Sequence, residues 1–321
     1  MRVFVAGATG AIGKQLVPLL VDAGHEVHGM TQHEARRTML TEMGAVPVVA
    51  DALEPEQVAE AVGKAQPDLI VHQLTSLGGW GMRALKRGAA VTNRLRTEGT
   101  DHLLSAGQTV GVQRFVAQSN YALYDRTGGS VKSEEDPLDP NPPGVLGVGL
   151  AAMRHLEEAV LGATWTEGIV LRYGGFYGPG TNMEPGGELF EMIRKRRFPL
   201  IGGGGGVWSF VHITDAAEAT LAAIEHGSRG VYNIADDDPA PVAEWLSELT
   251  HMLNGREPRR MPRFVLRVFT GEGGVVMMTD ARGASNAKAK RELGWSPAHP
   301  SWRQGFAAVA SETTRQRTSP H

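Results

Sequence analysis

The feature that most constrains this chain is a glycine loop placed directly after its first apolar run. Arg2–Ala6 is typical of a short strand, and Gly7-Ala-Thr-Gly10-Ala-Ile-Gly13 follows it and opens an amphipathic segment. At such a position glycines allow a tight turn, a close approach of the backbone to pyrophosphate, and packing of the helix on the strand. The helix N-terminus adds free N–H groups and positive potential. The loop predicts a dinucleotide site; the alternative is a purely structural turn.

The first half of the chain continues the alternation of short apolar runs with amphipathic stretches. Gly24, Gly44 and Gly111 stand where three of the helices should end, since glycine readily adopts the left-handed conformation found there. The pattern predicts an α/β fold of the Rossmann type, a doubly wound parallel sheet covered by helices on both faces. We expect strands at 2–6, 26–30, 46–49, 69–74 and 114–118, and helices at 12–23, 34–43, 55–64 and 83–108.

The second half is less regular and predicts a smaller, C-terminal substrate lobe. Residues 125–143 are polar and rich in Gly and Pro, which is typical of a long surface loop, and Gly202–Gly206 is a five-glycine loop whose mobility could be functional. We expect a dinucleotide-binding domain over 1–170, a mainly substrate-binding lobe over 171–310 with some segments returning to the sheet, and a flexible tail at 311–321. The expected elements are helices near 150–161, 215–225, 242–253 and 287–293, and a strand at 168–173.

Composition excludes several classes of site. The chain has 321 residues and no Cys, so any chemistry falls to His, carboxylates, hydroxyls or a bound cofactor. Lys plus Arg (32) nearly balances Asp plus Glu (35), and the basic run Arg194–Arg197 is too local to predict nucleic-acid binding. No apolar stretch approaches the ~18 residues of a membrane span. We expect a cytoplasmic protein with a small-molecule substrate, no membrane anchor and no metal.

The segment after the second expected strand bears on the choice of cofactor. An acidic residue there would favour NAD, whereas the chain has Thr31, Gln32 and, further on, Arg36 and Arg37. These groups could accept a 2′-phosphate, so NADP is favoured and NAD stays open; alternatively, both arginines merely cover a helix face. Asp51 is a candidate acceptor for the adenine amino group, with a solvated loop aspartate as the alternative.

Several further segments, in this order and spacing, complete a resemblance to the extended short-chain dehydrogenase/reductase family, the NAD(P)-dependent sugar epimerase/dehydratase group, over residues 1–310. They are Gly7, Gly10 and Gly13; Asn93 with Gly99-Thr100; Leu171-Arg-Tyr-Gly-Gly-Phe-Tyr-Gly-Pro-Gly180; Val211-His-Ile-Thr-Asp215; Gly230-Val-Tyr-Asn-Ile; and Ser285-Asn-Ala-Lys288 with Glu292-Leu-Gly-Trp295.

The resemblance implies where the cofactor and substrate bind. The phosphates would lie on the glycine loop, His72–Thr75 would pass along the nicotinamide, and Arg172–Pro179 would approach its carboxamide. The residues expected to bind the cofactor are Gly7, Thr9, Gly10, Ala11, Ile12, Gly13, Thr31, Arg36, Asp51, Ala52, Gln73, Leu74, Asn93, Tyr173 and Phe176. The residues expected to suit an aromatic ring or a sugar face are Phe176, Met183, Trp208 and Phe210.

The chain departs from the family at the acid/base site. The family uses a Tyr with a Lys four residues later, and a Ser or Thr that positions the substrate oxygen. None of the five tyrosines here has that Lys; alignment through Leu156-Glu157-Glu158 places Gly149 and Met153 where the pair should be. Asn120 falls at the usual serine position. The acid/base site is therefore rebuilt or redundant.

Tyr121 is the first candidate for a replacement proton donor, because it follows the fifth expected strand at the edge where ligands of such sheets bind. Ser119 and Asn120 would assist it. The alternative is a buried tyrosine with a satisfied hydroxyl. Other groups favour solvated or structural roles, and no His and carboxylate set has convincing metal-ligand spacing. They are Lys132, Arg154, His155, His212 and Asp215.

The residues thus predict an NAD(P)-dependent oxidoreductase or epimerase-like enzyme that acts on a small carbonyl or hydroxyl compound, sugar-like or aromatic, through a non-standard acid/base site. Two alternatives stay open: a non-redox isomerase, lyase or cyclase on the same fold, and a catalytically inactive dinucleotide sensor. By analogy with related enzymes, helices at 83–108 and 150–161 are the candidate interface of a homodimer.

Overall fold

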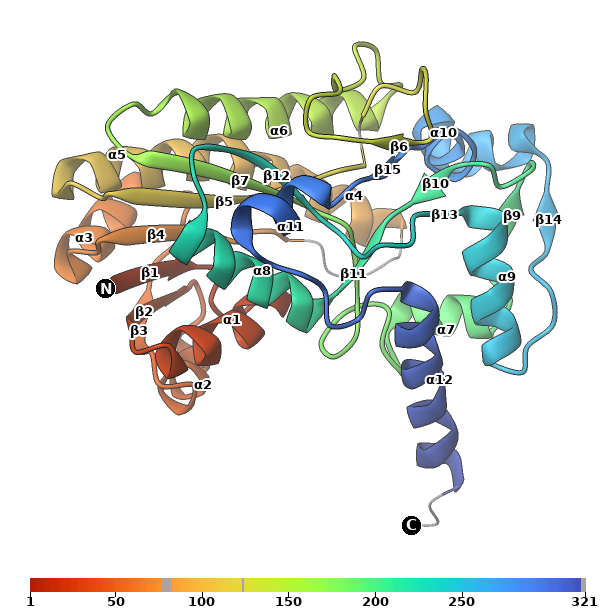
Figure 1. The fold of residues 1–321 in the computed structure, drawn as a ribbon, viewed down its shortest axis with the longest axis horizontal. Helices are drawn as coiled ribbons and strands as arrows, with labels where there is room; N and C mark the ends of the chain where they lie inside the picture. The colour runs from red at the N-terminus through yellow and green to blue at the C-terminus, as the bar shows by residue number, and fades with distance from the viewer. Residues whose placement is uncertain (77–81, 123, 319–321) are drawn as a thin grey trace.

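A computed structural model describes residues 1–76, 82–122 and 124–318. Its centre is a seven-stranded parallel sheet in the order β12-β7-β5-β4-β1-β2-β3 (Figure 1). The strand order reverses beside β1, as in a doubly wound sheet, so the predicted fold class is confirmed. The strands are β1 Arg2–Ala6, β2 Glu26–Thr31, β3 Val46–Val49, β4 Leu69–His72, β5 Arg114–Asn120, β7 Glu167–Tyr173 and β12 Gly230–Ile234.

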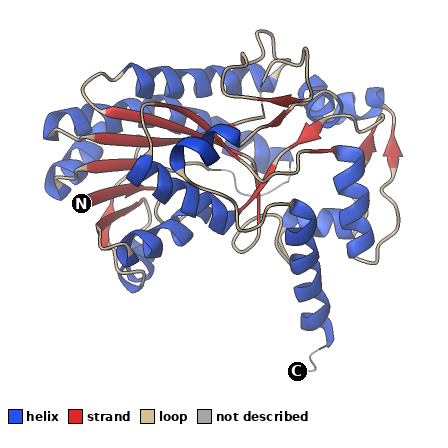
Figure 2. Cartoon of the chain, in the orientation of Figure 1, coloured by secondary structure: helices blue, strands red, loops and turns tan. Residues whose placement is uncertain are grey.

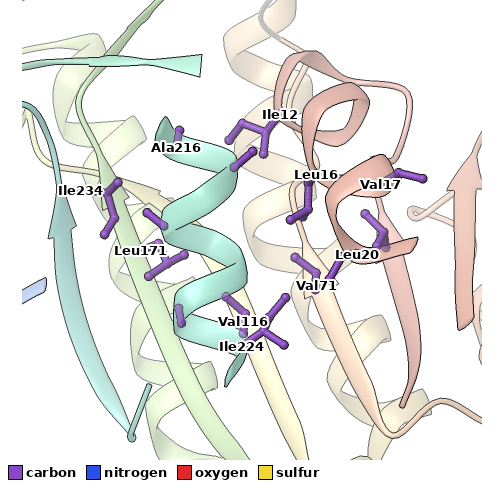
Figure 3. Close-up of a cluster of buried hydrophobic side chains, with 14 of the residues drawn as sticks. Ile12, Leu16, Val17, Leu20, Val71, Val116, Leu171, Ala216, Ile224 and Ile234 are labelled. Carbon is purple, nitrogen blue, oxygen red and sulfur yellow. The ribbon is translucent and has the colours of Figure 1, made fainter. Parts of the chain in front are cut away.

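Each face of the sheet has its own apolar core, because successive side chains of a strand point to opposite faces. Val3 and Val5 of β1 belong to one cluster and Phe4 and Ala6 to the other. Figure 3 shows the first cluster, in which aliphatic side chains of two helices interdigitate over the sheet. That face is covered by α1 Ala11–Asp22, α2 Arg37–Glu42, α8 Ile213–His226 and α11 Ala287–Leu293, and the opposite face by α3 Pro55–Ala65, α4 Met82–Arg94, α5 Thr100–Val110 and α6 Val145–Gly162.

The C-terminal lobe has a third core, built around Trp245, Trp302 and Phe306. Short strand pairs and helices surround it, as Figure 2 shows. The lobe elements used below are α7 Glu188–Arg194, β8 Gly175–Tyr177, β9 Leu200–Ile201, β10 Val207–Trp208, β11 Phe210–His212, α9 Val242–Met252, β14 Arg260–Met261, α10 Arg263–Thr279 and α12 Trp302–Thr318.

Several boundaries differ from the sequence prediction. The expected helix 83–108 is interrupted by a π-helical turn over Leu95–Gly99, and α6 begins at Val145 rather than near 150. The helices α7, α10 and α12 were not predicted. Helix α12 extends to Thr318 and so enters the segment expected to be a flexible tail. Its first half packs into the lobe core through Trp302, Phe306 and Val309, contacts that sequence periodicity alone did not reveal.

The glycines expected to end helices behave as predicted at α1, α2 and α5, where Gly24, Gly44 and Gly111 have φ values of 82°, 83° and 76°. The five-glycine loop differs from expectation. A Cβ at Gly206 would lie 2.7 Å from the carbonyl oxygen of Met277, and one at Gly204 would overlap the side chain of Leu200. Close packing against the ends of α9 and α10 therefore requires glycine at these two positions, which gives a reason for the loop other than mobility.

Candidate active site

A cavity of about 620 Å³ opens at the carboxyl ends of the parallel strands and extends into the C-terminal lobe. This is the edge where ligands of doubly wound sheets bind. The described residues that line it are Gly7, Thr9, Gly10, Ala11, Ile12, Met30, Thr31, Gln32, His33, Arg36, Ala50, Ala52, Gln73, Leu74, Thr75, Ser76, Val91, Leu95, Gln118, Gly175, Phe176, Gly180, Thr181, Asn182, Met183, Leu189, Trp208 and Phe210.

The glycine loop forms one wall and is shaped for a close backbone approach. Gly7 has a φ of 94°, and a Cβ there would lie 2.8 Å from the carbonyl oxygen of Gln73. A Cβ at Gly13 would overlap the backbone of Gly7 and Ala8, so Gly13 serves the packing of α1 on β1 and does not line the cavity. The loop lies beside the N-terminus of α1, which fits the phosphates of a dinucleotide.

The end of β2 forms the part of the cavity that bears on the cofactor choice. Arg36 Nη1 donates a hydrogen bond to Thr9 Oγ1 at 3.0 Å, and Thr9 Oγ1 lies 3.3 Å from Thr31 Oγ1. The backbone N–H of His33 donates to Thr31 Oγ1 at 3.3 Å. Among the described residues that line the cavity, Arg36 is the one arginine and none is Asp or Glu. This end therefore carries positive charge and hydroxyl groups.

Most of the predicted cofactor residues line the cavity, but three besides Gly13 do not. Asp51 Oδ1 accepts a hydrogen bond from the backbone of Leu53 at 2.9 Å, and the cavity is lined by Ala52 instead. Tyr173 is buried behind the lining, where its hydroxyl accepts a hydrogen bond from Gln73 Nε2 at 3.2 Å. Asn93 is half-buried on α4 and does not line the cavity.

Gln73 itself is suited to contact a ligand. Its side chain is buried, and its Oε1 has no hydrogen-bond partner within the described ranges. A buried amide oxygen without a partner is costly, and a ligand that donates a hydrogen bond would satisfy it.

The replacement proton donor predicted from the sequence lies outside the cavity lining. Tyr121 is buried, and its hydroxyl accepts a hydrogen bond from the backbone N–H of Ser209 at 2.9 Å. Burial raises the pKa of the Tyr121 phenol. Asn120 Oδ1 accepts a hydrogen bond from the backbone of Ala122 at 2.7 Å and does not line the cavity either. This placement favours the alternative interpretation of Tyr121 as a buried, satisfied hydroxyl.

Ser119 points away from the cavity into a buried ionic network. Its hydroxyl donates to Glu157 Oε1 at 2.6 Å, and Arg172 forms a bidentate pair with the same carboxylate at 2.9 and 2.5 Å. Arg172 also donates to the hydroxyl of Tyr124, which donates in turn to Asn233 Oδ1. The network joins α6 to the central strands and has a structural role.

The position of the family's Tyr and Lys is apolar here. Met153 is buried with Leu150, and Leu138 and Leu146 pack against them. A Cβ added at Gly149 would meet no atom within 4 Å in the part of the chain that the structure describes. Space for a Cβ therefore remains at Gly149, while the lysine is replaced by a thioether that packs in a small core.

Three groups expected at the surface around this region have partners of their own, and one of them, Lys132, is buried. Arg154 donates to the carbonyl oxygen of Asp139 at 3.1 Å, His155 Nε2 lies 2.8 Å from Asp101 Oδ1, and Lys132 Nζ lies 3.2 Å from Asp136 Oδ1. None of the three lines the cavity.

The substrate end of the cavity is aromatic and aliphatic. Phe176, Trp208, Phe210 and Met183, which were expected to suit a substrate, all line it. Trp208 is held in place by a hydrogen bond from its Nε1 to the carbonyl oxygen of Met277 at 2.8 Å. The polar groups at this end are neutral hydroxyls and amides: Thr75 belongs to the segment expected along the nicotinamide, whereas the sequence did not point to Ser76, Gln118, Thr181 and Asn182.

One group of described residues has ligand atoms close enough to hold a metal ion: His212, Asp215 and His299. The imidazole rings stack at 3.9 Å, and the Asp215 carboxylate accepts backbone hydrogen bonds from Ala298 at 3.2 Å and from His299 at 2.9 Å. Burial lowers the pKa of His212 to about 4. His212 is the N-cap of α8, and Asp215 ties α8 to the segment before α12, so both have structural roles. These contacts explain the cluster as structural.

Comparison with known proteins decides the family. Residues 3–235 match the family described as NAD dependent epimerase/dehydratase family. The chain belongs to this family. The resemblance drawn from the sequence is thereby confirmed, as is the expectation of an NAD(P)-dependent enzyme.

Two relatives illustrate the range within the family. A Streptomyces protein named 3-diazoavenalumate denitrifying reductase is 40% identical over 312 residues, which cover 95% of this chain and 99% of the relative. The 2-alkyl-3-oxoalkanoate reductase of Stenotrophomonas maltophilia is 27% identical over 263 residues, which cover 78% of this chain and 74% of that protein.

Solved structures share the fold. The dTDP-glucose 4,6-dehydratase of Streptomyces venezuelae, with NAD bound, superposes with a TM-score of 0.77 at 22% identity over 99% of this chain and 98% of that chain. The UDP-glucose 4-epimerase of Thermotoga maritima superposes with a TM-score of 0.75 at 23% identity over 99% of this chain and the whole of the other. Among the described residues, no helix combines the length and apolar character needed to span a membrane.

Proposed function

We propose that this protein is an NADPH-dependent reductase that delivers hydride to a small aromatic substrate in a step that needs no proton from a protein side chain. One observation carries the proposal. The described residues at the substrate end of the cavity are aromatic, aliphatic or neutral polar, and Gly149 and Met153 occupy the position of the family's acid/base pair. Carbonyl reduction would need a proton donor here, because hydride addition leaves an alkoxide.

An arenediazonium ion is a substrate class that meets this condition. Bound NADPH would supply a hydride whose electron pair forms the new C–H bond, while the C–N bond breaks and its electrons leave with dinitrogen, so that the products are the arene, N2 and NADP+. No proton is taken up in this balance. The 40% identical relative is named as a denitrifying reductase of a diazo compound, which supports the assignment.

The aromatic lining favours a flat cationic substrate. Phe176, Trp208 and Phe210 line the cavity and can contact an arene, and a cation over the face of a tryptophan is stabilised by roughly 0.5–2 kcal/mol. The hydrogen bond from Trp208 to Met277 fixes the indole in advance, so little side-chain entropy is lost on binding. In this proposal the residues bind, orient and exclude water, and none of them moves a proton.

The residues at the end of β2 support NADPH as the cofactor. The guanidinium of Arg36 and the hydroxyls of Thr9 and Thr31 can bind the 2′-phosphate, and the described residues of the lining include no carboxylate to repel it. The glycine loop and the unpaired Oε1 of Gln73 fit the rest of a dinucleotide. NAD remains the alternative cofactor.

The test is an anaerobic assay with NADPH and a stable arenediazonium salt, followed at the absorbance of the reduced nicotinamide. NADPH deuterated at one face of C4, and then at the other, should transfer deuterium to the arene from one face only, which separates enzymatic transfer from spontaneous reduction. A set of ketones serves as the comparison. Oxidation of NADPH by ketones but not by the diazonium salt would overturn the proposal in favour of a carbonyl reductase. Absence of NADPH oxidation with every substrate would favour a non-redox enzyme or a sensor.

A further inference from the structure

Two arginine-rich segments lie side by side on the outer part of the C-terminal lobe. The first segment, 194–197, precedes strand β9, and the second, 256–267, contains strand β14. The two strands pair in parallel (Figure 1), and the backbone N–H of Leu200 donates to the carbonyl oxygen of Arg259 at 2.9 Å. The pairing gathers more than a quarter of the chain's 32 Lys and Arg residues. We call this surface the basic face; it consists of Arg194, Lys195, Arg196, Arg197, Arg256, Arg259, Arg260, Arg263 and Arg267.

Much of this charge is not neutralised. Glu191 pairs with Arg194 and Lys195, Asp280 with Arg263, and Glu272 with Arg267. The remaining exposed arginines have no carboxylate oxygen within 4.0 Å in the described ranges; they are Arg197, Arg256, Arg259 and Arg260. A local concentration of positive charge on a protein with a net charge of −3 favours an anionic partner at this face.

The basic face also presents an aromatic side chain. Phe264, in the first turn of α10, is 71% exposed and lies between Arg263 and Arg267 in the sequence. Val265, the next residue, is half-buried, while the half-buried Met252, Leu253 and Met261 pack against the lobe core. Arginine, aromatic residues and methionine are enriched, and lysine depleted, in protein–protein interfaces. The basic face has eight arginines and one lysine, so its composition matches that of such interfaces.

Two elements connect the basic face to the substrate end of the cavity. Leu189, near the start of α7, lines the cavity, and Arg194 ends the same helix. Seven helical residues span only ~10 Å. The α10 segment is kinked at Gly271, so that its first helix begins at Arg263 and its second helix supplies the carbonyl oxygen of Met277 that holds Trp208. A partner bound here would therefore lie close to the place where a substrate is bound.

We propose that the basic face docks an acidic partner protein through a helix or loop rich in Asp and Glu. Rigid guanidinium forks suit carboxylates, and Phe264 gives the contact an apolar anchor. A membrane surface would call for a broader apolar stripe than this single exposed aromatic side chain on the described part of the face. The proposal does not depend on the reaction assigned above.

The test uses a fluorescein-labelled helical peptide of about 20 residues with Glu on one face and Leu on the other, titrated with the full-length protein and followed by anisotropy. Anionic phospholipid vesicles and a short DNA duplex are titrated in parallel. The variant is Arg259→Glu with Arg260→Glu. The matched control is Lys64→Glu with Arg291→Glu, which makes the same change of net charge at exposed residues on α3 and α11. Thermal melting verifies the fold of both.

We expect saturable peptide binding that weakens at least tenfold as salt rises, is lost in the Arg259 and Arg260 variant, and persists in the control. Phe264→Ala should weaken it by about tenfold, as loss of an interface anchor does. Equal loss in both double variants would show a non-specific charge effect and overturn the proposal. Absence of peptide binding, or stronger binding to vesicles or DNA with the same dependence on Arg259 and Arg260, would also overturn it.

Discussion

Arg36 reaches back from the turn after β2 to the glycine loop, where its Nη1 donates a hydrogen bond to Thr9 Oγ1 at 3.0 Å. The contact places a positive charge beside the loop that would hold the pyrophosphate, at the point where an NAD-binding protein has a carboxylate. The next residue, Arg37, pairs instead with Glu34 at 3.4 Å and does not line the cavity.

Arg36→Ala should therefore weaken NADPH binding while leaving NADH binding nearly unchanged. A charge-assisted hydrogen bond contributes about 1.5–3 kcal/mol, so the Kd for NADPH should rise roughly 10- to 100-fold. Fluorescence titration with each nucleotide measures both constants, and Arg37→Ala is the matched control. An equal loss for NADH would mean that Arg36 supports the loop rather than a 2′-phosphate.

Tyr121→Phe should keep its activity but lose stability. The ring stays in its buried site, and the backbone N–H of Ser209 loses its acceptor, at a cost of about 1–3 kcal/mol. We expect a lower Tm and an unchanged kcat. A loss of kcat by a factor of 100 or so with little change in Tm would restore Tyr121 as the proton donor, since general acid catalysis contributes about that much.

Gly149→Tyr combined with Met153→Lys should create the ability to reduce ketones. A side chain can start at Gly149 because its Cβ would meet no described atom of a neighbouring element within 4 Å, and the lysine would replace Met153 one turn later. Hydride transfer to a ketone should rise about 10²-fold over the wild type. Each single substitution is a control and should give little ketone reduction, because the phenol and the ammonium act together. If the double variant is folded but gains no ketone reduction, the acid/base position has been assigned wrongly.

Asp236→Asn should stabilise the protein at alkaline pH. Burial raises the pKa of Asp236 to about 8, and its Oδ2 has no partner in the described ranges. Because the folded pKa is raised, the contribution of Asp236 to stability is complete below about pH 4 and is lost as the pH rises through about 8. Asparagine does not ionise, so the Asp236→Asn variant does not lose this contribution to stability as the pH rises. At pH 8 it should exceed the wild type by roughly 1–3 kcal/mol, and the difference should vanish towards pH 4.

Thermal melts across this pH range check the prediction. Asp237→Asn is the control, because Asp237 is a neighbouring aspartate paired with Lys290 at 2.6 Å. A stability difference for Asp236→Asn that does not change with pH would show that the effect has another origin than the buried carboxyl.

The sequence was most informative where structure follows from local pattern. Gly7 and Gly10 of the glycine loop, together with Thr9, Thr31 and Arg36, were predicted residue by residue and do line the cavity. Asp51 and Asn93 do not line the cavity, because Asp51 accepts a hydrogen bond from the backbone of Leu53 and Asn93 lies on α4, and sequence spacing reveals neither placement. Gln118 was missed for the same reason, since a glutamine near the end of a strand has no distinctive signal.

What the sequence by itself determined is the alternation of strands and helices, the glycine loop, and the absence of a Tyr-x-x-x-Lys pair. These are properties of neighbouring residues, and they can be counted along the chain. Only the tertiary structure decided that Tyr121 is buried against Ser209, that Met153 belongs to a small apolar core, and that two distant arginine runs form one face. Burial, hydrogen bonding and local charge arise from contacts between residues far apart in the sequence, and folding is what brings those residues together.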